Sequence, residues 1–83
     1  MSGSSPEQQI IASLKTIALG TGGSELPDPD YSNDTQVATV AAGYLNMISE
    51  AFGCGQLDLS NIQTISDAMS IACTLLSRIA GAV

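Results

Sequence analysis

The apolar residues of this chain recur at the spacing of helix faces, first in a segment near the N-terminus. Ile10, Leu14 and Ile17 follow one another at intervals of four and three residues, which places them on one side of a helix. Ser5 and Pro6 are residue types favoured at an N-cap and at the first helical position. Because glycine commonly ends helices, Gly20 marks the expected end. The pattern predicts a helix over residues 6–20.

A wider apolar face follows in residues 33–52. Asn33 is a favourable N-cap because its side-chain oxygen can accept a hydrogen bond from a backbone N–H of the first turn, and Asp34 complements the helix dipole. We predict a second helix here, with Tyr44 and Met47 in a core or an interface rather than in a ligand pocket. The apolar face is formed by Val37, Val40, Ala41, Tyr44, Leu45, Ile48, Ala51 and Phe52.

The last segment has the most regular apolar pattern in the chain. A spacing of three and four residues is held over three heptads, as in helices that pack along one another. We call these residues the seam: Ile62, Ile65, Met69, Ala72, Leu76, Ile79 and Val83. A second stripe, Ala68, Ile71 and Leu75, flanks the seam. Two apolar stripes need two covering surfaces, so we predict that one is buried within the protomer and that the seam is an interface with a neighbour. The alternative is a monomer in which both stripes pack on the first two helices.

The connections between these helices are rich in residues that break helices. Residues 21–33 contain Gly, Pro and Asp and predict an acidic loop, which is long enough that it must either carry contacts or move. Residues 53–58 are predicted to form a turn before a third helix that is capped by Asp58, with Leu57 and Ile62 as a hydrophobic staple, or by Ser60. Two antiparallel helices would then flank this turn.

These elements predict an all-α protein of a single domain over residues 1–83, with a disordered start at residues 1–5. The expected architecture is a small helical hairpin or a three-helix bundle with a long heptad-like C-terminal helix. With 83 residues, the chain can bury only a small core.

Charge excludes several classes of partner. Charged residues make up 12% of the chain, against about 25% in soluble domains in general, and Lys15 and Arg78 are the only basic ones. A net charge of −6 argues against binding to nucleic acid. No apolar stretch is long enough to span a membrane, and the polar N-terminus does not resemble a cleavable signal peptide. We therefore expect a soluble protein that is cytoplasmic or exported by a signal-independent route.

Candidate chemistry is sparse. The absence of His and the presence of only two Cys remove most metal and nucleophile arrangements. Asp28, Asp30 and Ser32 alternate as in a calcium-binding loop, but the required glycine and the terminal glutamate are missing, so we expect a solvated acidic loop. We predict no catalytic residues, no cofactor, no metal and no enzymatic activity.

The two cysteines are predicted to lie about 20 Å apart, with one in the turn and one far into the last helix, which is too far for an intramolecular disulfide. We expect Cys73 to be buried as a small apolar residue. Cys54 is expected to be exposed in the turn and is the candidate for an intermolecular disulfide.

Acidic helical proteins of this size include acyl carrier proteins, whose modified serine lies in an Asp-Ser-Leu motif. Here the order is Asp58-Leu59-Ser60, so no residue matches the attachment site. A carrier function is the least favoured alternative.

The layout of the chain resembles the needle subunits of type III secretion systems. It has a polar N-terminus, a helix, the turn "PDPDYSND" and a long C-terminal helical region with few charges. The resemblance implies helical hairpins that stack into a hollow filament, export without a cleaved signal, and a chaperone for the C-terminal helix. We therefore predict a non-enzymatic structural subunit that self-associates, or binds a helical partner, through apolar helix faces. The alternative is a small monomeric helical adaptor or chaperone-like binding protein.

Overall fold

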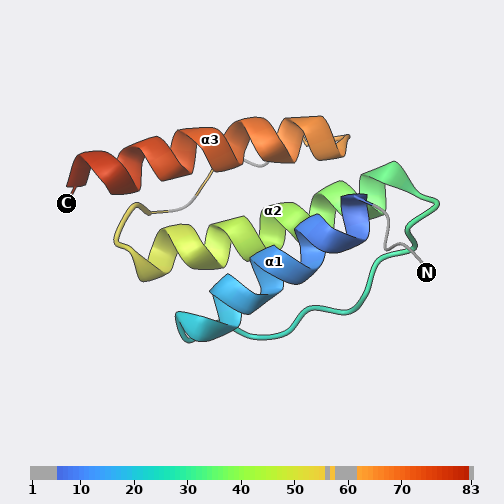
Figure 1. Cartoon of the computed structure of the whole chain (residues 1–83), viewed down its shortest axis with the longest axis horizontal. Helices are drawn as coiled ribbons and strands as arrows, with labels where there is room; N and C mark the ends of the chain where they lie inside the picture. The colour runs from blue at the N-terminus through green and yellow to red at the C-terminus, as the bar shows by residue number, and fades with distance from the viewer. Residues whose placement is uncertain (1–5, 56, 58–61, 83) are drawn as a thin grey trace.

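The computed structural model describes residues 6–55, 57 and 62–82 and consists of three helices in that part of the chain (Figure 1). Their bounds are α1 Pro6–Gly20, α2 Asp34–Ala51 and α3 Ile65–Ala82. The described residues contain no strand. The prediction of an all-α fold is confirmed, in its three-helix form. The expected disordered start and the N-cap at Ser5 lie outside the described residues.

α1 ends at Gly20 as predicted, but a different glycine turns the chain. Gly22 has φ 95°, in the left-handed region that suits glycine. Its N–H donates to the Leu19 carbonyl at 3.1 Å, and the Gly23 N–H donates to the Ala18 carbonyl at 2.8 Å. These two bonds close the helix as a Schellman motif, which satisfies carbonyls that would otherwise lack donors.

α2 begins and ends where the sequence predicts. The Asn33 side chain accepts a hydrogen bond from the Gln36 N–H at 3.1 Å. At the other end Gly53 has φ 75°, and the Cys54 N–H donates to the Ser49 carbonyl at 2.8 Å. The two ends of this helix are thus held by a side-chain cap and a second Schellman motif.

The three helices run in the same direction, and α1 and α3 both pack on α2 (Figure 1). The expectation that antiparallel helices flank the turn after α2 is therefore wrong. A parallel neighbour requires the chain to return along the full length of the helix, which is about 22 Å for the 15 residues of α1. The loop over residues 21–33 provides this return path between α1 and α2.

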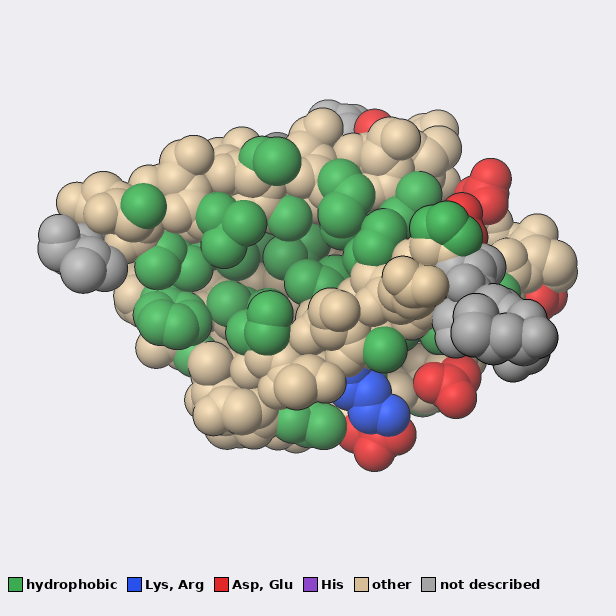
Figure 2. Space-filling view, viewed as in Figure 1, with side chains coloured by type: hydrophobic (Ala, Val, Ile, Leu, Met, Phe, Trp, Pro, Cys, Tyr) green, Lys and Arg blue, Asp and Glu red, His purple; other side chains and the backbone are tan. Residues whose placement is uncertain are grey.

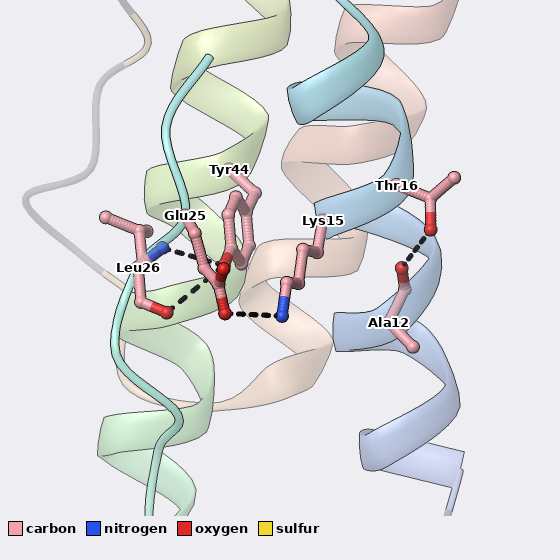
Figure 3. A network of polar contacts seen from close by, with 6 residues as sticks. All are labelled: Ala12, Lys15, Thr16, Glu25, Leu26 and Tyr44. Carbon is pink, nitrogen blue, oxygen red and sulfur yellow. Dashed lines mark hydrogen bonds and ion pairs between the residues drawn. The ribbon is translucent and has the colours of Figure 1, made fainter.

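The loop over residues 21–33 is a strap along α2 that carries contacts. The Tyr44 hydroxyl accepts a hydrogen bond from the Leu26 N–H at 2.9 Å and lies 3.3 Å from the Leu26 carbonyl, to which it donates (Figure 3). Lys15 forms an ion pair with Glu25 at 2.7 Å, and this bond raises the pKa of the lysine. Pro29 is buried. The strap therefore joins α1 to α2 through both polar and apolar contacts.

The core lies on both sides of α2, which supplies most of its side chains. Its buried apolar residues are Ile11, Ala18, Val37, Ala38, Ala41, Ala42, Tyr44, Leu45, Ile48, Ala68 and Leu75. Four of these are alanines of α2 and α3, so helix backbones approach closely and dispersion contacts replace large side chains. The prediction that Tyr44 belongs to a core is confirmed.

α3 starts later than predicted. Ile62 and Gln63 are not helical, so a helix that starts at Asp58 or Ser60 is wrong, although those two residues themselves lie outside the described part. The N-cap is Thr64, whose hydroxyl accepts from the Asp67 N–H at 3.3 Å. The Asp67 carboxylate in turn accepts from the Thr64 N–H at 3.1 Å, which completes a capping box.

Candidate functional site

The two apolar stripes of α3 have different environments. Leu75, in the second stripe, is 1% exposed and Ala68 is buried with it against α2. Leu76, in the seam, is 64% exposed. The second stripe therefore holds α3 to its own protomer. In the rest of the described seam, Ile65, Met69, Ala72 and Ile79 are half-buried and pack against the core cluster. The protomer therefore covers part of the seam, as in the monomeric alternative, and leaves Leu76 uncovered.

The seam forms one wall of a groove between α1 and α3. Figure 2 shows apolar side chains gathered over this face of the molecule. The groove consists of two recesses that share Leu14 and Ala72, one of about 420 Å³ nearer the helix starts and one of about 250 Å³ nearer the helix ends. Its apolar lining comprises Pro6, Ile10, Leu14, Ile17, Leu45, Ile48, Phe52, Met69, Ala72, Leu75, Leu76 and Ile79.

The recess nearer the helix ends is bordered by the most exposed apolar side chains. Phe52 is 52% exposed and Ile17 48%, and both line this recess together with Leu76. They come from three different elements, because Phe52 follows α2, Ile17 lies on α1 and Leu76 lies on α3. Exposed large apolar residues that gather around one hollow are typical of an interaction surface.

Among the residues that the structure describes, no charged side chain lines the groove. The polar side chains in its lining are Gln9 and Ser13, both in the recess nearer the helix starts. Lys15, the cation of α1, is turned toward Glu25 in the strap. Since the lining offers no ion and almost no hydrogen-bond group, burial of apolar surface is the interaction that this groove can provide.

The structure brings four of the predicted interface residues into the groove, namely Met69, Ala72, Leu76 and Ile79. Ile65 is half-buried and packs on the core, and Ile62 lies before the start of α3. Val83 lies outside the described residues. Sequence reasoning placed Ile10, Leu14 and Ile17 on one face of a helix but did not predict that this face lines a groove. Phe52 was likewise placed on an apolar helix face without a part in the groove.

The two cysteines have environments opposite to those expected. Cys73 is exposed, and the expectation that it is buried is wrong. Cys54 is half-buried and packs against the core cluster, so it is not the exposed thiol that was predicted. The spacing of Cys73 from Ser66, Ser70, Ser77 and Ala80 places it on the polar face of α3, and this spacing was the signal available in the sequence.

The acidic loop uses its carboxylates locally. Asp30 accepts hydrogen bonds from the hydroxyl of Ser32 at 2.6 Å and from its backbone N–H at 3.0 Å, and both lower the pKa of Asp30. In the part of the chain that the structure describes, no three His, Cys, Asp or Glu side chains cluster as a metal site would require. Of the three helices, none has the length and apolar content needed to cross a membrane over its described residues.

Comparison with models of protein families, with curated proteins and with solved structures found no match to this chain. The case for a function therefore rests on the groove and on the distribution of charge around it.

Proposed function

We propose that this chain is a non-enzymatic structural subunit that associates with copies of itself through the groove. The observation that carries the proposal is the exposure of Leu76 on the rim of an apolar recess, next to Ile17 and Phe52. Burial of apolar surface that is otherwise exposed to water gains a free energy of roughly 25 cal/mol per Å². A copy of the same chain offers the same uncharged surface in return.

The composition of the chain supports this proposal. Only 12% of its residues are charged, so association has few charged groups to remove from water, although each copy carries a net charge of −6. A contact between different surfaces of neighbouring copies would give a filament, as the resemblance to needle subunits of an export apparatus implies, whereas a two-fold contact of groove with groove would give a closed dimer. A second candidate function is a monomeric helical adaptor, whose groove would take an apolar helix of another protein.

Sedimentation velocity over a range of concentrations, with and without reductant, tests this proposal. We expect an average mass that rises with concentration in both conditions, because the groove needs no disulfide. Electron microscopy of the same samples separates closed oligomers from filaments. A chain that remains monomeric at the highest concentration would overturn self-association and favour the adaptor.

A further inference from the structure

We infer that the occupant of the groove is α3 of a second copy, which runs antiparallel to α3 of the first around a two-fold axis near residue 74. This inference rests on the proposed self-association and specifies its geometry. Each copy of α3 then lies in the groove of the other.

The spacing of the seam is the first observation that supports this register. In an antiparallel pair with a two-fold axis, two residues lie opposite each other when their residue numbers add up to twice the residue number at the axis. An axis at residue 74 places Met69 opposite Ile79 and Ala72 opposite Leu76. All four residues line the groove, and of these Leu76 is exposed while Met69, Ala72 and Ile79 are half-buried.

The sizes of these side chains are the second observation. In the antiparallel register the exposed Leu76 of one copy packs over the small Ala72 of the other. A parallel pair in register would instead place Ala72 opposite Ala72 and leave a void beside it. Because protein interiors are packed without such voids, the large-on-small pairing is favoured.

The distribution of charge is the third observation. The three helices run in the same direction, and each has an acidic residue in its first turn, namely Glu7, Asp34 and Asp67. A parallel pair would bring two such acidic ends together. With the axis at residue 74, the antiparallel pair separates the two Asp67 residues by about 21 Å along the helices, which exceeds the screening length of about 8 Å at physiological salt.

The register makes a specific claim about the exposed flank of α3. Rotation about a two-fold axis perpendicular to both helices keeps a given flank of the seam on the same side in both copies. Cys73 is exposed on one flank of the seam. The Cys73 residues of the two copies therefore face each other across the two-fold axis, with an offset of about 3 Å along the direction of the helices. In a parallel pair they would lie on opposite flanks.

Cross-linking tests the register. Mild oxidation of the wild-type chain is expected to give a disulfide-linked dimer that is retained in Cys54→Ser and lost in Cys73→Ser. A sharper test uses two variants without native cysteines, C54S/C73S/S66C and C54S/C73S/A80C, because Ser66 and Ala80 are exposed on the same flank as Cys73. Circular dichroism confirms that each variant is folded.

In the antiparallel register, residue 66 of one copy and residue 80 of the other lie at the same level to within about 3 Å along the direction of the helices. A 66–66 or 80–80 pair is offset by roughly 20 Å, well beyond the separation of about 7 Å that a disulfide allows. We therefore expect the mixed sample to form the 66–80 dimer at least about tenfold faster than either variant alone forms a homodimer, given this difference in reach.

The outcomes separate the register from self-association. Dimers in sedimentation that give no excess of the 66–80 product would overturn the antiparallel register and leave the proposed function standing. Monomers in sedimentation, with no cross-linked product in any mixture, would overturn both.

Discussion

Leu75 and Leu76 are adjacent on α3 but lie in opposite environments. Leu75 is 1% exposed and packs against α2, whereas Leu76 is 64% exposed on the rim of the groove. A leucine therefore packs within the protomer at position 75, and a leucine is available to a partner at position 76. Substitutions at these two positions separate folding from association.

Leu75→Ala is expected to lower the free energy of unfolding by about 2–5 kcal/mol, because it leaves a cavity between α3 and α2. That loss is comparable to the whole stability of a small domain. Leu76→Ala is the matched control and is expected to change the free energy of unfolding by about 0.5 kcal/mol or less in dilute samples. Urea denaturation followed by circular dichroism measures both. Equal losses at the two positions would contradict the burial of Leu75 and the exposure of Leu76.

Gly20 and Gly22 provide a second matched pair, at the end of α1. A Cβ at either position would have no atom within 4 Å, so backbone conformation alone decides the effect. Gly22→Ala is expected to destabilise the protein by about 1–2 kcal/mol because Gly22 is left-handed. Gly20→Ala is expected to stabilise it by up to about 1 kcal/mol because Gly20 is helical. Thermal denaturation of the two variants should give shifts of opposite sign, and shifts of the same sign would be inconsistent with the Schellman motif.

The strap over residues 21–33 depends on the Tyr44 hydroxyl. Tyr44→Phe removes the group that bonds both the N–H and the carbonyl of Leu26, so we expect a loss of about 1–3 kcal/mol in the free energy of unfolding. Hydrogen exchange should show faster exchange at the Leu26 amide. Tyr31→Phe is the control, because in the described structure the Tyr31 side chain packs on the core through apolar contact. An unchanged Leu26 amide in Tyr44→Phe would contradict this role for the hydroxyl.

The start of α3 should be sensitive to acid. Hydrogen bonds from the Gln63 and Thr64 N–H groups lower the pKa of Asp67 below its ordinary value. A lowered pKa in the folded state means that the carboxylate stabilises the protein above the ordinary aspartate range, and that this contribution is lost as the pH falls through the folded pKa.

Asp67→Asn removes this titration, so the difference in melting temperature between wild type and Asp67→Asn is expected to shrink as the pH falls below about 4. Glu7→Gln in α1 is the control for the general effect of removing one acidic group from a helix start. A difference that is constant between pH 7 and pH 2 would show that Asp67 does not cap α3.

Local signals in the sequence were sufficient for the first two helices. Pro6, Gly20 and the Asn33 cap predicted their bounds because caps and helix ends act over a few residues. The start of α3 was misplaced because Asp58 and Ser60 are equally good caps by type. Thr64 with Asp67 is the pair that forms the reciprocal hydrogen bonds.

Local signals in the sequence could not predict the parallel direction of the helices or the presence of the groove. The parallel arrangement depends on contacts such as Leu26 with Tyr44, which join residues far apart in the chain. The sequence predicts two stripes on α3 with the seam as the interface, but how much of each stripe the protomer covers is decided by the packing of α3 on α2. The contribution of Ile17 to the groove likewise depends on the gap left between α1 and α3.

The central claim is that the groove is a surface for self-association, and sedimentation equilibrium of three chains tests it most directly. The chains are wild type, Leu76→Asp and Leu19→Asp, where Leu19 is a control leucine that is 40% exposed on α1 and does not line the groove. The account predicts that wild type and Leu19→Asp associate with similar affinity, and that a charge at Leu76 weakens association by about 100-fold or more while the chain remains helical, as for a buried unpaired charge at an interface. Association of Leu76→Asp at wild-type affinity, or a wild type that is monomeric at high concentration, would contradict it.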